Sequence, residues 1–221
     1  MTKENDYRNT VYCPVLNRVE EQKQNLEKEI KAAFPRTKII YNKVNHRDSF
    51  YHKRFAEIYN DKCAYCGARW GLLPVECFEV DHFLNEASFP DTTEGRAKAG
   101  RMENLVLSCI SCNRGKRGIA IEPPYDSLLN VDNGNITAVF KRDEEYYIQI
   151  CDTYKDDEFI QQFYGALHLG YETRRLDYLG LLLEGKYQAE KNTERKRKLG
   201  ECLSILLKKR NRMTVTGRSL S

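Results

Sequence analysis

The chain has 221 residues, of which 41% are hydrophobic and 31% are charged, and its formal net charge is +4. This apolar share suffices for a folded core and excludes a chain that is disordered throughout. The sequence has no run of about 18 apolar residues, so we expect no membrane span, and its first residues lack the apolar centre of a signal peptide. We therefore expect a cytoplasmic protein. In that reducing compartment, eight cysteines favour metal binding or catalysis over disulfides.

Residues 1–60 predict a helical N-terminal region. Within residues 16–34, apolar side chains recur at approximate helical spacing among Glu, Gln and Lys, as in an amphipathic helix. These apolar residues are Leu16, Val19, Leu26, Ile30 and Phe34. Residues 50–60 predict a second helix, which leads into the first cysteine pair.

Two Cys-x-x-Cys pairs follow, Cys63 with Cys66 and Cys109 with Cys112, and 42 residues lie between them. A two-residue spacer lets both thiolates reach one ion, and two such turns complete a tetrahedral site of four sulfurs with no open position. We therefore predict a structural zinc site, with four buried free cysteines as the alternative. The interval exceeds the roughly 15–20 residues of ordinary zinc ribbons, so a separate piece of structure is expected between the pairs.

The segment between the pairs predicts a strand, a loop and a second strand. Residues 75–80 alternate with β-branched or aromatic side chains and run into Asp81 and His82, and residues 104–108 form a short apolar run. Residues 84–103 contain a proline, two glycines and basic residues, which is typical of an exposed loop. A turn or short helix after Cys112 would complete a β-hairpin followed by a helix.

Side chains suited to catalysis lie at the ends of these strands. Asp81 and His82 are adjacent at the end of the first strand, Asn104 opens the second strand, and Asn113 follows the last cysteine. This order, with Cys-Asn-Arg-Gly-Lys at residues 112–116, resembles the HNH nuclease family, whose zinc-bearing branch carries such cysteine pairs. The match covers residues 62–118. Residues 104–116 also resemble the HNH domain of RNA-guided CRISPR nucleases, which lacks the cysteines.

The resemblance implies a ββα-metal finger that hydrolyses phosphodiester bonds and leaves 3′-hydroxyl and 5′-phosphate ends. His82 would be the general base, because a neutral imidazole can take a proton from the attacking water near pH 7. Asp81 and Asn113 would bind a catalytic Mg²⁺ or Mn²⁺ ion, since these ions favour oxygen ligands. Asn104 would brace the loop and orient the ring of His82. Asn113 replaces the commoner histidine at its position, a substitution known within the family.

Two groups of basic residues are candidates for nucleic-acid contacts. Arg114, Lys116 and Arg117 follow the second cysteine pair closely. The other group lies within residues 186–218, which hold eleven Lys and Arg against three acidic residues, a local net charge of +8. It includes Arg195, Lys196, Arg197 and Lys198. For both groups, a solvated helix face is the alternative.

Residues 121–221 predict a β-hairpin from segments 135–140 and 146–150, followed by helices over 156–169, 171–190 and 193–210. We therefore expect an α+β protein with three regions: a helical region over 1–60, an HNH unit stapled by a four-cysteine zinc site over 61–120, and a mixed, mainly helical basic region over 121–221.

The expected activity is metal-dependent cleavage of DNA. The layout also loosely resembles small HNH proteins of bacterial antiphage systems, some of them retron-linked, which act beside an ATPase. DNA and an ATPase or other defence protein are therefore the expected partners. Two alternatives stay open: a noncatalytic zinc module that binds nucleic acid or protein, and an RNase that uses the same site.

Overall fold

Three helices form the N-terminal part of the computed structural model, which describes residues 6–213. They are α1 (Val19–Ala33), α2 (Tyr41–Val44) and α3 (Phe50–Ile58). The buried residues of α1 recur every three or four positions, as one face of a helix requires, and are Val19, Lys23, Leu26 and Ile30. Ser49 caps the start of α3, because its hydroxyl accepts a hydrogen bond from the backbone N–H of His52.

Two antiparallel strands and a helix follow. The strand β1 (Phe78–His82) pairs with β2 (Leu105–Cys109) in a register that sets His82 opposite Leu105 and Phe78 opposite Cys109. The helix α5 (Ile110–Lys116) starts directly after β2. Between the strands, the chain forms a short helix, α4 (Thr93–Ala99), which Thr92 caps through its side chain. Single turns of 3-10 helix occupy residues 75–77, 86–88 and 102–104.

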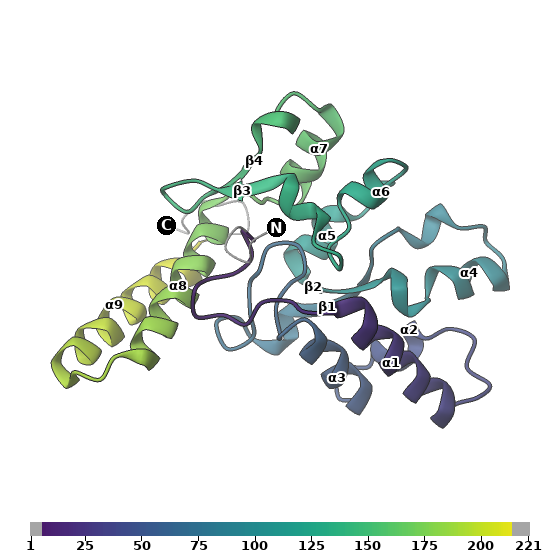
Figure 1. The fold of residues 1–221 in the computed structure, drawn as a ribbon, viewed down its shortest axis with the longest axis horizontal. Coiled ribbons are helices and arrows are strands. Elements are labelled where there is room, and N and C mark those ends of the chain that lie inside the picture. The colour runs from purple at the N-terminus through teal and green to yellow at the C-terminus, as the bar shows by residue number, and fades with distance from the viewer. Residues whose placement is uncertain (1–5, 214–221) are drawn as a thin grey trace.

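Up to Met213, the C-terminal part contains a second small antiparallel sheet and four α-helices. Its elements are α6 (Tyr125–Leu128), β3 (Phe140–Arg142), β4 (Ile148–Ile150), α7 (Glu158–Ala166), α8 (Glu172–Ala189) and α9 (Thr193–Asn211). The helices α8 and α9 form a long hairpin that projects away from the β1–β2 sheet, so that the turn between them lies far from that sheet (Figure 1).

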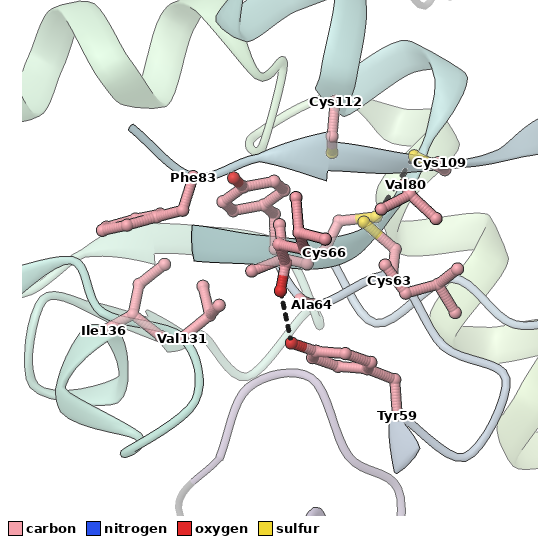
Figure 2. Close-up of a cluster of buried hydrophobic side chains, with 14 of the residues drawn as sticks. Tyr59, Cys63, Ala64, Cys66, Val80, Phe83, Cys109, Cys112, Val131 and Ile136 are labelled. Carbon is pink, nitrogen blue, oxygen red and sulfur yellow. Dashed lines mark hydrogen bonds between the residues drawn. The ribbon is translucent and has the colours of Figure 1, made fainter. Parts of the chain in front are cut away.

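One hydrophobic core joins these parts. Its buried side chains come from α1, α3, both strands of the β1–β2 sheet, β3, β4 and α7. Figure 2 shows a portion of it, in which Val80, Phe83 and Val131 share the interior with the cysteines of the two pairs. Gly115 allows α5 to lie against the end of α7, because a Cβ at that position would be 2.0 Å from the carbonyl oxygen of Ala166.

The α+β class expected from the sequence is confirmed. The expected elements are present with shifted ends: residues 75–77 belong to a 3-10 turn, and the strand starts at Phe78. Residues 135–138 likewise form a 3-10 turn, so that β3 consists of Phe140–Arg142 only. The expected loop over 84–103 is wrong in part, because α4 lies within it. No helix in the described part of the chain has the length and apolar character needed to cross a membrane.

Candidate functional site

The four cysteines of the two pairs form one cluster. Cys63 and Cys66 lie in a tight turn after α3, Cys109 ends β2, and Cys112 lies in the first turn of α5. All four are buried, and their sulfur atoms lie within 4.8 Å of one another (Figure 2). The turn is held against the sheet because the backbone N–H of Ala64 donates to the carbonyl oxygen of Leu107 at 2.8 Å.

The spacing of the sulfur atoms fits a zinc ion. Four sulfurs at about 2.3 Å from one ion in tetrahedral geometry stand about 3.8 Å apart. The Sγ atoms of Cys66 and Cys109 are 3.8 Å apart, which is too long for a disulfide of about 2.05 Å. The expected set of four cysteines is therefore brought together in a geometry that suits structural zinc.

A buried arginine lies against this cluster. The guanidinium group of Arg174, at the start of α8, lies 3.2 Å from the sulfur of Cys112 and 3.5 Å from that of Cys109. It also donates to the hydroxyl of Ser111 at 2.9 Å and to the carbonyl oxygen of Leu167 at 3.2 Å. Burial acts to lower the pKa of Arg174, but the neighbouring cysteine sulfurs outweigh it and raise that pKa above the usual range. Four thiolates around one Zn²⁺ carry a net charge of −2, which a buried cation stabilises.

A polar hollow lies beside the cluster, between β1 and α5. Nine residues line it: Glu79, Asp81, His82, Asn85, Glu86, Asn113, Arg114, Lys116 and Arg117. Apart from the cysteines, seven catalytic, metal-binding and basic residues were predicted along positions 81–117, and the fold brings six of them together at this hollow. The seventh, Asn104, does not line the hollow.

Asp81 lies at the base of this hollow and is 7% exposed. One carboxylate oxygen accepts a hydrogen bond from the hydroxyl of Tyr65 at 2.9 Å, and the other lies 3.4 Å from Nζ of Lys116. Burial raises the pKa of Asp81 to about 6, and the nearby Lys116 ammonium limits the rise. The carboxylate is therefore ionised above about pH 6.

His82 is half-buried, and its ring packs on the ring of Tyr41 from α2, with 4.4 Å between the centroids. Burial lowers the pKa of His82; Glu86 opposes this effect and Lys116 adds to it. The imidazole is consequently neutral at pH 7, which is the form that can accept a proton.

A side-chain hydrogen bond joins Asn113 on α5 to Glu79 on β1. The amide group of Asn113, on α5, donates to the carboxylate of Glu79 at 2.8 Å. Glu79 shares a face of β1 with Asp81, two residues further on. Sequence reasoning missed Glu79, although the alternation of side chains along the strand places it on the same face as Asp81. A second hollow, lined in part by residues 45–48, shares both Glu79 and Asn113 with the first.

Asn104 is buried and joins two loop segments. Its amide group donates to the carbonyl oxygens of Leu84 at 3.0 Å and Ala99 at 2.8 Å, and its side-chain oxygen accepts from the N–H of Leu84 at 2.8 Å. These bonds hold the chain just beyond His82 against the end of α4. A buried ion pair supports the same region, because Nζ of Lys23 reaches both Asp132 and the carbonyl oxygen of Leu105.

The basic residues differ in position. Arg114 and Arg117 are exposed at the edge of the hollow. The expectation for Lys116 is corrected, because a phosphate contact needs an accessible ammonium group and this side chain is only 1% exposed. Its ammonium donates instead to the carbonyl oxygens of His82 and Phe83 and to the side chain of Asn85.

The basic group on α9 lies in the first turns of that helix, near the turn that joins it to α8 and far from the β1–β2 sheet (Figure 1). Three of its members are exposed, Lys196 is partly buried, and all four have charged or aromatic neighbours. Arg195 pairs with Glu190, Arg197 with Glu194 and Glu201, and Lys198 with Glu194, while Lys196 lies over the ring of Tyr187.

A scan of protein-family models found no match to this chain, and searches of curated proteins and of solved structures found no significant similarity.

Proposed function

We propose that this protein is a metal-dependent endonuclease of the HNH type that hydrolyses DNA. The observation that carries the proposal is the hollow between β1 and α5, which gathers Asp81, His82 and Asn113 next to the cysteine cluster. The order of two antiparallel strands and a helix supports a ββα-metal finger in this segment. The four-cysteine cluster, with zinc bound, would fix both the turn before β1 and the start of α5.

The residues of the hollow fit a catalytic Mg²⁺ or Mn²⁺ ion with few protein ligands. Asp81 supplies a carboxylate, Asn113 an amide oxygen, and Glu79 a second carboxylate on the same strand face. In the described part of the chain, only the four cysteines form a group of three or more His, Cys, Asp or Glu ligand atoms in close reach. Mg²⁺ suits this arrangement because it commonly binds one or two carboxylates and completes its shell with water and substrate phosphate. When bound, the ion would stabilise negative charge on the scissile phosphate and the departing 3′ oxygen.

His82 has the properties of a general base. Its neutral ring lines the hollow, and its packing against Tyr41 limits rotation of the ring. In the proposed reaction the ring takes a proton from water while the water oxygen forms a bond to phosphorus and the bond to the 3′ oxygen breaks. Asn104 acts through the backbone only, because it holds the segment after His82 in place. Arg114 and Arg117 are placed to pair with phosphate oxygens at the edge.

Cleavage assays on matched histidine variants test the proposal. Wild-type protein with Mg²⁺ or Mn²⁺ should nick or cut plasmid DNA, and His82→Ala should lose at least about a hundredfold in single-turnover rate, since general-base catalysis contributes that much or more. His168→Ala is the control, because His168 lines neither of the two hollows and its ring packs on Tyr171. Equal rates for wild type and His82→Ala would refute the assignment. RNA of the same sequence distinguishes a DNase from an RNase.

A noncatalytic zinc module is the second candidate. One observation favours it: Asp81 is already engaged by Tyr65 and Lys116, as a purely structural buried ion pair would be. In that case metal content and nucleic-acid binding would persist, every substrate would stay intact, and His82→Ala would change only stability.

The proposed biological setting is bacterial antiphage defence beside an ATPase or another defence protein. Its support is the loose resemblance in layout, and the α8–α9 hairpin offers a long exposed element for such a partner (Figure 1). Phage infection of bacteria that carry the complete system with the wild-type or the His82→Ala chain tests it. Equal plaque counts would contradict the defence role.

A further inference from the structure

A second basic segment lies next to the candidate site. Residues 34–54 hold six Lys and Arg against one acidic residue, Asp48, a local net charge of +5 over 21 positions. The basic residues are Arg36, Lys38, Lys43, Arg47, Lys53 and Arg54. We call this segment the 34–54 surface. It includes α2 and most of α3 and precedes the first cysteine pair.

Exposed aromatic rings alternate with these cations. Phe50 is 63% exposed and Phe34 is 38% exposed, and Tyr51 lies between them with ring centroids at 5.5 and 5.9 Å. The ammonium of Lys43 lies 3.9 Å from the centroid of Phe34, and the guanidinium of Arg54 lies 5.9 Å from that of Phe50. A largely exposed phenylalanine among cations is typical of surfaces on which unpaired bases stack.

The 34–54 surface is continuous with the candidate site. Arg47 lies 3.6 Å from the carboxylate of Glu79 and helps to line the second hollow, which shares Glu79 and Asn113 with the first. The ring of Tyr41 on α2 packs against the ring of His82. Figure 1 shows α1, α2 and α3 beside the β1–β2 sheet, whereas the turn of the α8–α9 hairpin lies well away from it. A strand held on this surface would therefore run directly into the hollow.

The positive charge of this surface is weakly compensated. Among residues 6–213, carboxylates lie within ion-pair distance of only two of its six cations, as Arg47 faces Glu79 and Arg54 faces Glu29. On α9, by contrast, three of the four basic residues at positions 195–198 have such partners. Arg47 is 42% exposed and lies 3.6 Å from Glu79, so its guanidinium keeps N–H donors for a phosphate. Such cations beside exposed aromatic rings attract phosphate and bases together, which favours single-stranded nucleic acid over a protein or an ion.

We propose that the 34–54 surface binds a single-stranded part of the nucleic-acid substrate, with a phosphate on Arg47 and an unpaired base stacked on Phe50. The identity of this ligand as substrate rests on the proposed function, whereas its binding does not. The surface would guide the strand toward His82, so that cleavage occurs at or beside unpaired nucleotides.

Binding measured without catalysis tests the inference. Fluorescein-labelled single-stranded DNA of about 20 nucleotides, spanning a site size of about 4–16, is titrated into His82→Ala protein with neither added divalent metal nor chelator. A duplex and single-stranded RNA of the same sequence are run in parallel. Phe50→Ala should weaken binding of single strands at least about fivefold, because loss of one stacked base costs about 1 kcal/mol or more. Arg47→Ala should weaken binding and reduce the salt slope by about 0.7.

Two control variants remove the same kinds of side chain, a cation and an aromatic ring, at positions outside the 34–54 surface. Arg18→Ala removes an exposed charge that pairs with Glu21, and Tyr146→Ala removes a partly exposed ring stacked on Tyr178. Both should bind like the parent protein, and melting curves should show that all four variants are folded. Loss of affinity confined to Phe50→Ala and Arg47→Ala supports the inference, and a preference for DNA or RNA identifies the substrate class.

Three results would overturn it: no binding of single strands by the parent protein, equal affinity of all four variants, or a loss limited to the duplex. These outcomes are separable from failure of the proposed function. If the wild type cleaves DNA while Phe50→Ala and Arg47→Ala bind normally, the nuclease proposal stands and this inference fails. If nothing is cleaved but Phe50→Ala and Arg47→Ala bind poorly, the nuclease proposal fails and this inference stands.

Discussion

Replacing Arg174 with leucine tests whether the cysteine cluster holds a metal ion. Arg174 is 4% exposed, its guanidinium group contacts two of the four sulfurs, and Ser111 and Leu167 accept its other hydrogen bonds. With zinc bound, the cluster carries a charge of −2, and Arg174 is a buried cation beside it. Removal of one partner of a buried ion pair costs about 3–5 kcal/mol, because the other partner is left uncompensated.

The expected fall in melting temperature follows from this free-energy cost. For a chain of this length, 1 kcal/mol lowers the melting temperature by about 2–4 °C, so Arg174→Leu should lower it by roughly 6–20 °C. Zinc affinity should fall about 10–100-fold, as is typical when a group that contacts metal ligands is lost. Without zinc, the guanidinium faces less negative charge, because hydrogen bonds among the cysteines and burial raise the pKa of the Cys66 and Cys112 thiols. The same substitution should then cost much less stability.

Thermal melting with and without zinc, together with competition against a zinc-binding dye, measures both effects. Arg175→Leu is the matched control, because Arg175 is the next residue on α8 and forms a partly exposed pair with Glu172. Its loss should cost less than about 1 kcal/mol. Arg174→Lys should lie between the two, since it keeps the charge but loses the planar geometry. Equal destabilisation of zinc-bound and zinc-free protein by Arg174→Leu would refute the role in metal binding.

Three further predictions concern the sheet, the helix α5 and the hollow. Cys109→Ser should abolish zinc binding and unfold the β1–β2 unit, because structural zinc contributes folding free energy directly; a full equivalent of zinc with unchanged circular dichroism would contradict this. Gly115→Ala should destabilise the protein by about 1–3 kcal/mol in urea unfolding, because the added Cβ would meet the carbonyl oxygen of Ala166 at 2.0 Å; an unchanged unfolding midpoint would show that α5 lies elsewhere. The Mg²⁺ concentration needed for half-maximal cleavage should rise about tenfold from pH 7 to pH 5. The reason is that Asp81, with a pKa of about 6, becomes protonated as pH falls and loses its charge as a metal ligand. A half-maximal Mg²⁺ concentration that does not vary with pH would contradict this prediction.

The local pattern of the sequence was enough to predict the metal cluster and the order of elements around it. Two Cys-x-x-Cys spacings impose short turns, and alternation along residues 75–80 predicts a strand that runs into Asp81 and His82. The ends of the elements were predicted less well. Residues 75–77 share the alternation but form a 3-10 turn, because the pairing with β2 extends only from Cys109 opposite Phe78 to Leu105 opposite His82.

The short helix α4 was missed for a related reason. It has seven residues, one of them a glycine, and a helix of this length is marginal without tertiary support. Its glycine, Gly95, lies where a Cβ would clash with the carbonyl oxygen of Pro90. The capping residue Thr92 was the available signal, since its side chain accepts a hydrogen bond from the N–H of Gly95.

The sequence by itself determined which residue types could bind metal, accept a proton or attract phosphate, because spacing along the chain restricts which of them share one turn or one strand face. Only the tertiary structure decided which of them meet. It turned Lys116 inward to Asp81, brought Arg174 from a distant helix onto the cysteine sulfurs, and set the 34–54 surface beside His82. These contacts join residues up to 65 positions apart in the sequence. Packing of the shared core decides which residues meet, and a local sequence pattern does not contain that information.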